Sequence, residues 1–264
     1  MNIAVITGAS SGMGRQFTIQ LSQAEKFDEM WVIARRKEAL DRLSQEISCP
    51  LRPISLDLTD PRSFETYKAL LEQEKPQVRV LVNAAGFGKF GEAMEIPLAE
   101  NFSMVDLNCK ALLAMTQLTV PYMAPGSRIV ELDSLSAFQP VPYITVYGAT
   151  KAFVLSYSRA LNQELKPRGI RVMAVSPGWV RTEFFQRAET TNIEKKVQYY
   201  DRTYSAEEVV RTALHDLYHT KKDVSIHGYS VRRQVRLVKL LPHSLVMKIW
   251  MNQQKKSKPV PQDP

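Results

Sequence analysis

The chain has 264 residues, 44% of them hydrophobic and 23% charged, which fits one ordinary globular domain. No stretch approaches the roughly 18 apolar residues of a membrane span and no signal core follows Met1, so we expect a cytoplasmic protein. The net charge of +8 is concentrated near the C-terminus, which argues against nucleic-acid binding by the body, and Cys49 and Cys109 lack metal-ligand spacing, so no metal site is expected.

The first predicted strand, at 2–6, runs into a glycine-rich turn. A helix follows, with apolar positions at Phe17, Leu21 and Ala24. A strand, a glycine turn and a helix in this order favour dinucleotide binding, because glycines let phosphates approach closely and the helix N-terminus attracts negative charge. The loop residues expected to contact the cofactor are Gly8, Ser10, Ser11, Gly12, Met13 and Gly14.

The second predicted strand, at 30–34, ends at two arginines. Arg35 lies 21 residues after Gly14, where an acid would bind the ribose 2′-hydroxyl of NAD. An arginine there can instead hold a 2′-phosphate through a charge-assisted, two-pronged contact. The sequence therefore predicts NADP(H). Alternatively, Arg35 and Arg36 only begin a solvated helix that runs to Ile47.

Strands and helices continue to alternate along the chain. Further strands are predicted at 51–56, 78–82, 128–132, 170–175 and 224–226, and further helices at 62–74, 99–122, 145–165 and 206–218. Repeated strand–helix units imply an α/β fold, a Rossmann-like doubly wound parallel sheet flanked by helices. Ligands of such folds bind at the carboxyl ends of the strands, so the loops named above should converge on one edge.

Tyr147 and Lys151 lie four residues apart at the start of the helix predicted at 145–165. At this spacing both side chains leave the same helix face. A nearby lysine can lower the pKa of a phenol, so the pair is a candidate proton donor and acceptor. The alternative is an amphipathic helix with a surface lysine.

Taken together, from residue 2 to about 226, these motifs resemble the short-chain dehydrogenase/reductase family. The resemblance implies a catalytic tetrad of Asn108, Ser134, Tyr147 and Lys151. It also implies cofactor contacts from Asp57 and Leu58 beside the adenine and from Asn83 at the start of a turn, and nicotinamide-side contacts from Tyr147, Lys151, Pro177, Gly178 and Thr182.

The resemblance also assigns a role to each tetrad residue. Tyr147 would exchange a proton with the substrate oxygen, Ser134 would hold that oxygen, and Lys151 would lower the pKa of the tyrosine and bind the nicotinamide ribose. Asn108 would order a water linked to Lys151. Ser136 is the alternative to Ser134, because two residues apart on an extended segment face the same side.

Apolar and aromatic residues surround the expected substrate site: Phe87, Leu135, Phe138, Val141, Trp179, Phe184 and Phe185. Such a pocket suits a bulky hydrophobic ketone or secondary alcohol. A hydroxysteroid or bile-acid-like compound is the first expectation, and a 3-oxoacyl thioester is the second. A third possibility is an NADP-binding sensor or scaffold without catalysis, because fold does not fix function.

Residues 229–264 form a basic extension of the body at 1–228. They hold eight Lys and Arg residues against Asp263, a net charge of +7. Apolar residues recur at helical spacing on both sides of Pro242, namely Val231, Val235, Val238 and Leu241, then Leu245, Val246, Ile249 and Trp250. Two amphipathic helices could cover the substrate mouth or a homodimer partner, or lie on an acidic membrane surface. The extension replaces a segment that supports tetramers in the family, so a homodimer is expected.

Overall fold

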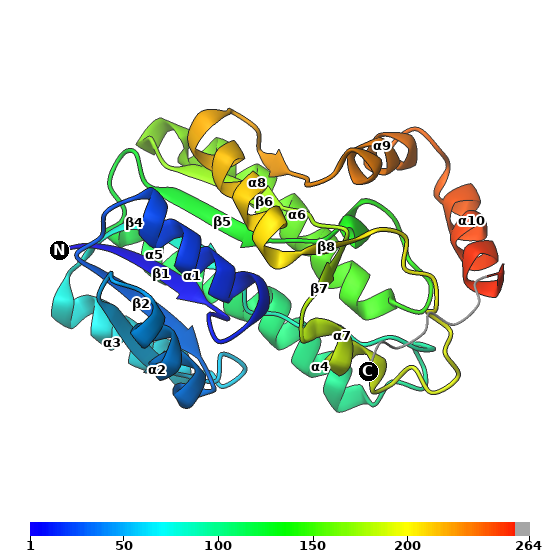
Figure 1. Ribbon diagram of the computed structural model, residues 1–264, viewed down its shortest axis with the longest axis horizontal. Helices are drawn as coiled ribbons and strands as arrows, with labels where there is room; N and C mark the ends of the chain where they lie inside the picture. The colour runs from blue at the N-terminus through cyan, green and yellow to red at the C-terminus, as the bar shows by residue number, and fades with distance from the viewer. Residues whose placement is uncertain (257–264) are drawn as a thin grey trace.

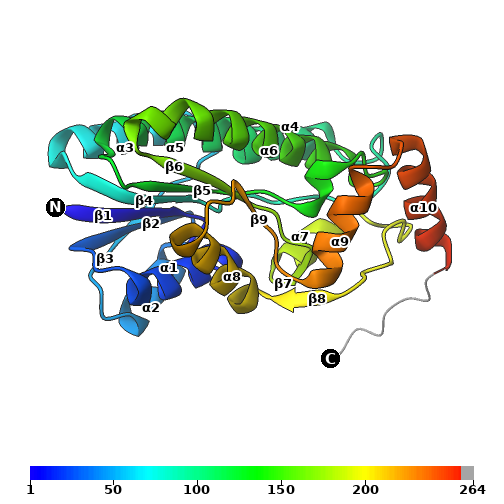
Figure 2. The same ribbon diagram turned by 90° about the horizontal axis from the view of Figure 1, so that it is seen from above.

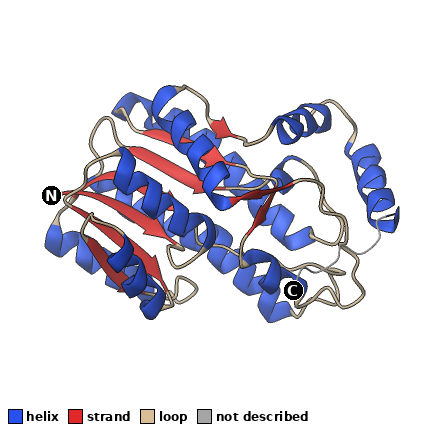
Figure 3. Cartoon of the chain, viewed as in Figure 1, coloured by secondary structure: helices blue, strands red, loops and turns tan. Residues whose placement is uncertain are grey.

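A seven-stranded parallel sheet, in the order β3-β2-β1-β4-β5-β6-β9, forms the centre of the computed structural model, which describes residues 1–256 (Figure 1). The strands, red in Figure 3, are β1 (Asn2–Thr7), β2 (Glu29–Ala34), β3 (Leu51–Ser55), β4 (Gln77–Asn83), β5 (Arg128–Leu132), β6 (Arg171–Val175) and β9 (Val224–Ser225). The predicted doubly wound sheet is therefore confirmed.

Helices cover both faces of the sheet (Figure 2). One face carries α1 (Gly12–Ala24), α2 (Lys37–Glu46) and α8 (Ala206–His219), and the other carries α3 (Arg62–Glu74), α4 (Leu98–Val105), α5 (Leu112–Thr119) and α6 (Thr145–Leu165). Alternate strand residues supply the two cores: Ala4 and Ile6 pack toward Phe17 of α1, whereas Ile3 and Val5 lie in the core that includes Leu71 of α3. This alternation follows from the two-residue period of a strand that is buried on both faces.

Two regions differ from the predicted elements. The helix expected at 99–122 is interrupted by a π-helical turn, η1 (Asp106–Ala111), and ends in a 3₁₀ turn, η2 (Val120–Tyr122). After β6 come β7 (Trp179–Arg181) and β8 (Thr203–Ser205), which pair in parallel as a separate sheet. The helix α7 (Phe184–Glu189) lies between them in the sequence. Two shorter turns are η3 (Leu135–Phe138) and η4 (Lys166–Arg168). Elements this short carry too few residues for a periodic pattern.

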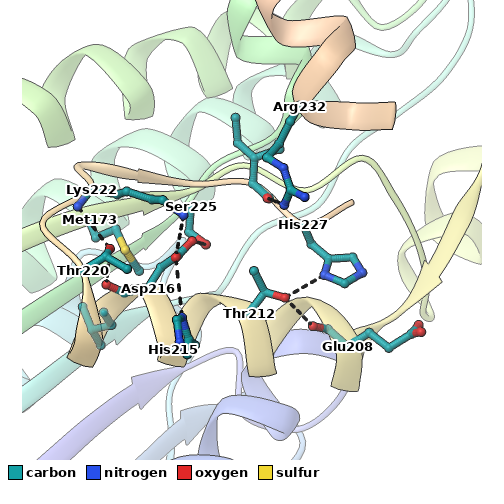
Figure 4. A network of polar contacts seen from close by, with 12 residues as sticks. Met173, Glu208, Thr212, His215, Asp216, Thr220, Lys222, Ser225, His227 and Arg232 are labelled. Atoms are coloured by element: carbon teal, nitrogen blue, oxygen red, sulfur yellow. Dashed lines mark hydrogen bonds and ion pairs between the residues drawn. The ribbon is translucent and has the colours of Figure 1, made fainter. Parts of the chain in front are cut away.

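The last strand is held in place by polar side chains of α8 (Figure 4). Asp216, which is buried, accepts hydrogen bonds from Lys222 Nζ (2.8 Å) and Ser225 Oγ (2.9 Å). One turn earlier on α8, Thr212 Oγ1 lies 2.7 Å from His227 Nδ1. These contacts position the chain where it leaves the sheet for the C-terminal helices.

Two helices follow the sheet, α9 (Tyr229–Val238) and α10 (His243–Lys256). They lie at the end of the molecule opposite the N-terminus, with α9 nearer to β7 and β8 and α10 farther out (Figure 2). Most of the predicted apolar stripes face inward, since Val231, Val235, Val238, Val246 and Trp250 are buried. No helix in residues 1–256 is long and apolar enough to cross a membrane. Lys258 and Asp263 of the predicted basic extension lie outside the described residues.

Candidate active site

Two adjoining cavities lie at the carboxyl ends of the strands. The larger, of about 570 Å³, extends from the glycine loop past Arg35 and Asp57. The smaller, of about 480 Å³, lies between the body and the helices α9 and α10. Residues that line both cavities are Ser134, Tyr147, Gly178 and Trp179. A group bound in one cavity can therefore meet a group bound in the other beside Tyr147.

The glycine loop forms a close cradle at the start of α1. Gly8 and Gly12 have φ values of +69° and +52°, which favour glycine. A Cβ atom on Gly14 would collide with the carbonyl of Gly8, and one on Gly12 would lie 3.3 Å from Thr182. With Ser10, Ser11 and Met13 also lining the larger cavity, the cradle fits the diphosphate of a dinucleotide at a helix N-terminus.

Arg35 and Asp57 lie together at the far end of the larger cavity. Arg35 Nη1 is 3.9 Å from Asp57 Oδ2, and Leu58 lines the same wall. Although burial acts in the opposite direction, hydrogen bonds from Thr59 and the charge of Arg35 lower the pKa of Asp57. Arg36 also lines this cavity, where it pairs with Glu183 at 2.8 Å and donates to Ser10 Oγ at 3.2 Å. The two arginines therefore have different surroundings, although neither lies within a helix.

Asn83 does not reach the cavity, contrary to the prediction that it contacts the cofactor. Its buried amide donates to Thr116 Oγ1 at 2.9 Å, beneath the turn formed by Ala84, Ala85 and Gly86. The turn itself lines the larger cavity. Since Asn83 is the last residue of β4, the pleat of the strand directs its side chain into the core.

The tetrad residues come from three elements and meet at one place. Ser134 follows β5, and its hydroxyl is hydrogen-bonded to Tyr147 of α6. Lys151, one turn further along α6, places Nζ 5.6 Å from the centre of the Tyr147 ring and donates to the carbonyl of Leu132 at 2.6 Å. Ser136 lines the smaller cavity but not the larger one. Its buried Oγ has no hydrogen-bond partner in the described residues. Ser134 is therefore the serine beside Tyr147.

Asn108 lies in the π-helical turn and is fully enclosed. Its Nδ2 donates to Phe87 O (2.9 Å) and Thr150 Oγ1 (3.0 Å), while its Oδ1 accepts from the Phe87 amide (3.1 Å). A Cβ atom on Gly86 would lie 3.0 Å from Asn108 Oδ1 and 3.7 Å from Lys151 Nζ. The π turn therefore brings Asn108 beside Lys151. The expected water between them stays a prediction.

Burial dominates the electrostatics of this site. It raises the pKa of Tyr147, against the hydrogen bond from Ser134, and it lowers the pKa of Lys151. The pKa of Tyr147 is therefore raised rather than lowered, because burial dominates, and the lowering effect expected of Lys151, whose ammonium lies over the ring, stays a prediction. Sequence reasoning also missed two carboxyl groups behind the site: burial raises the pKa of Asp133, and that of Glu131 to about 8.

The residues predicted for the substrate pocket divide between the two cavities. Leu135, Val141 and Trp179 line the smaller cavity, whereas Phe87, Phe184, Phe185 and again Trp179 line the larger one. Phe184 packs against Tyr147 with ring centres 5.3 Å apart. Phe138 lines neither cavity. The turn η3 directs its ring toward α9, where Lys239 Nζ lies 5.1 Å from the ring centre.

Two groups of residues near the site were not named as site residues by the sequence analysis. One is Gly88, where a Cβ atom would lie 2.8 Å from Phe184 and 2.9 Å from Tyr147. Any larger residue at this position would therefore collide with the tyrosine ring. The other is the wall of the smaller cavity contributed by the C-terminal helices and the link between them: Tyr229, Ser230, Val231, Arg233, Gln234, Leu237, Val238, Leu241, Val246, Ile249, Trp250 and Gln253. The sequence analysis offered a cover over the substrate mouth as one alternative for these helices, but no motif identified which of their residues line it.

Comparison with known proteins agrees with this geometry. A family model for short chain dehydrogenases matches residues 2–193. Sulfoacetaldehyde reductase 2 of Chromohalobacter salexigens is 35% identical over 193 residues, covering 69% of this chain and 74% of its own. The human very-long-chain 3-oxoacyl-CoA reductase is 28% identical over 270 residues, covering 97% of this chain and 80% of its own.

Solved structures extend the likeness to the whole chain. A short-chain dehydrogenase from Sphingobium yanoikuyae in complex with NADPH is 26% identical, with a TM-score of 0.77 over 99% of each chain. A bulky-bulky ketone specific alcohol dehydrogenase from Comamonas testosteroni is also 26% identical, with a TM-score of 0.71 over 91% of this chain and 92% of its own. The chain thus belongs to the short-chain dehydrogenase/reductase family, whose members are nicotinamide-dependent oxidoreductases acting on CH–OH and C=O groups.

Proposed function

We propose that the chain is an NADP(H)-dependent oxidoreductase that interconverts a bulky hydrophobic ketone and its secondary alcohol. The observation that supports this function is the position of Ser134 and Tyr147 on the wall shared by the two cavities. The larger cavity contains the glycine cradle, and the smaller one is lined mainly by apolar and aromatic side chains. A nicotinamide cofactor in the larger cavity would supply or accept the hydride.

The tetrad would handle the proton that accompanies the hydride. Because burial raises the pKa of Tyr147, the phenol holds its proton at neutral pH and can donate it to a carbonyl oxygen, which favours reduction. The hydrogen bond from Ser134 would stabilise the phenolate that remains, and so would the charge of Lys151 over the ring. Asn108 would hold the loop at Phe87 against this site.

NADP(H) is favoured over NAD(H) by Arg35. Its guanidinium is exposed at the far wall of the larger cavity beside Asp57, where it can bind a 2′-phosphate. The names of two solved relatives support the same choice: the Sphingobium enzyme is a complex with NADPH, and a serine dehydrogenase that is 28% identical is a complex with NADP⁺.

The aromatic and aliphatic lining of the smaller cavity supports a bulky ketone as the substrate. The Comamonas relative, which is named as specific for bulky-bulky ketones, supports the same substrate class. A hydroxysteroid or bile-acid-like compound remains our first candidate. A 7β-hydroxysteroid dehydrogenase is similar in fold, but at 19% identity it supports the fold alone. A 3-oxoacyl thioester is the second candidate, because the human 3-oxoacyl-CoA reductase matches 97% of the chain, which includes most of the C-terminal helices.

Tyr147→Phe tests the proposed chemistry. With NADPH and a panel of hydrophobic ketones and 3-oxoacyl thioesters, we expect the variant to consume NADPH at least about a hundredfold more slowly than the unaltered chain, because it has no proton to donate. Direct titration should show that the variant still binds NADPH. Tyr157→Phe, on the same helix but lining neither cavity, is the matched control and should retain activity. Equal rates for Tyr147→Phe and the unaltered chain would contradict the assignment and favour the sensor or scaffold alternative.

A further inference from the structure

Arg187 lines the larger cavity from α7, across from the strand ends that carry Arg35. The helix α7 lies between the β7–β8 pair and α4 (Figure 1). Its C-terminal end is anchored to the body, because Lys89 Nζ donates to Thr190 Oγ1 at 2.7 Å and that hydroxyl donates to the Arg187 carbonyl at 2.9 Å. The Arg187 side chain therefore extends from an anchored position on the wall opposite Arg35.

The charge of Arg187 has no close counter-charge in the part of the chain that the structure describes. Its guanidinium carbon lies 3.3 Å from the centre of the Phe87 ring, and no ion pair or side-chain hydrogen bond accompanies this contact. The acids within electrostatic range are nearer to other cations: Glu100 pairs with Lys89 at 3.3 Å, and Asp57 with Arg35. Burial and the charge of Arg35 both lower the pKa of Arg187.

Two arginines that repel each other across a cleft are stabilised by an anion bound between them. We propose that Arg187 is a second phosphate-binding residue of the cofactor site, which holds a phosphate of the dinucleotide from the wall opposite Arg35. This inference rests on the proposed nicotinamide dinucleotide cofactor. The phosphate is either the 2′-phosphate near Arg35 or the diphosphate at the glycine cradle, since a guanidinium binds both with the same two-pronged geometry. Phe184, one turn earlier on α7, packs on Tyr147, so the same helix contacts both ends of the site.

The test is direct titration of the full-length chain with NADPH and with NADH, followed by the fluorescence of the nicotinamide. Arg187→Gln should weaken NADPH binding at least about tenfold. Arg187→Lys should lose less, because it keeps the charge without the planar fork. Arg211→Gln, which removes an exposed arginine paired with Glu207 on its own helix, should leave both affinities unchanged.

Each outcome separates the alternatives. A loss confined to NADPH identifies the 2′-phosphate, and an equal loss for both dinucleotides identifies the diphosphate. Unchanged binding of both overturns the inference while the proposed function stands. If the unaltered chain binds neither dinucleotide, the proposed cofactor fails, and this inference with it. If Arg187 had only a structural role, Arg187→Gln would lower the unfolding temperature of the free protein but leave the salt dependence of NADPH binding unaltered. We expect instead that NADPH binding by Arg187→Gln depends less on salt. If Arg187→Gln does not fold, the smaller loss of NADPH affinity expected for Arg187→Lys, which keeps the charge but not the planar fork, is the readout instead.

Discussion

At the scale of single residues, the site is governed by buried charge. Lys151 interacts electrostatically with Asp133 and Glu131, two carboxyl groups on and just after β5, as well as lying over the ring of Tyr147. Each carboxyl group has one oxygen without a hydrogen-bond partner in the described residues. Removing a charged group from water without full compensation is costly, so these groups favour their neutral forms and Lys151 supplies the nearby positive charge.

Glu131→Gln should remove a pH dependence of stability. Burial raises the pKa of Glu131 from 4.5 in a solvated carboxyl group to about 8 in the folded chain. The contribution of this group to stability is therefore fully present below about pH 4.5 and is lost as the pH rises through about 8. In urea unfolding at pH 5, 6.5 and 8, the free energy of unfolding should decline with rising pH in the unaltered chain. It should decline less in Glu131→Gln.

The control for this prediction is Glu38→Gln, at an exposed position on α2. It should keep the pH dependence of the unaltered chain. Parallel stability curves for Glu131→Gln and the unaltered chain would show that Glu131 is not held in its neutral form.

At the scale of elements, the C-terminal helices complete the smaller cavity through a few contacts. Trp250 of α10 donates its indole N–H to the carbonyl of Pro142 at 3.0 Å and stacks on Trp179, with ring centres 6.5 Å apart. Val231 of α9 packs over Gly178, where a Cβ atom would lie 3.1 Å away. The position of both helices is therefore coupled to residues beside Tyr147.

Trp250→Phe should loosen α10 while an aromatic ring still packs on Trp179. The variant lacks the N–H donor to Pro142, a hydrogen bond worth roughly 1 kcal/mol, so we expect KM for the ketone to rise about three- to tenfold. Because Trp250 does not line the larger cavity, NADPH binding should stay unchanged. Steady-state kinetics and titration separate the two effects, and an unaltered KM would show that α10 does not shape the substrate site.

At the scale of the whole molecule, positive charge and exposed apolar side chains occur together at one end. Residues 229–256 contain seven Lys and Arg residues and no acid. Outside the buried stripes, Leu237, Leu240, Leu245 and Ile249 are exposed, Leu240 by 81%. Contact of this surface with an acidic membrane or with a second copy of the chain stays a prediction, as do the homodimer and the division of the chain at residue 228.

Removing residues 229–264 tests that division. The seven-stranded sheet is complete at β9, so the shortened chain should still unfold cooperatively and bind NADPH. It should lose most ketone reduction, because α9 and α10 supply one wall of the smaller cavity. Loss of a cooperative thermal transition would mean instead that these helices belong to the folding unit of the body.

The sequence by itself determined the doubly wound sheet, the glycine cradle and the meeting of Ser134, Tyr147 and Lys151. The sheet, the cradle and the Tyr147–Lys151 pair follow from local periodicity and from loops that must converge at the carboxyl ends of parallel strands, and the place of Ser134 beside the pair follows from the resemblance to the family. Only the tertiary structure decided that Asn83 lies beneath the cavity, that Phe138 turns toward α9 and that Arg187 faces the cleft without an acid partner among residues 1–256. It also decided that the pKa of Tyr147 is raised, because the packing buries the phenol. Burial and the distances between charges depend on the packing of segments far apart in the chain, and no local pattern encodes them.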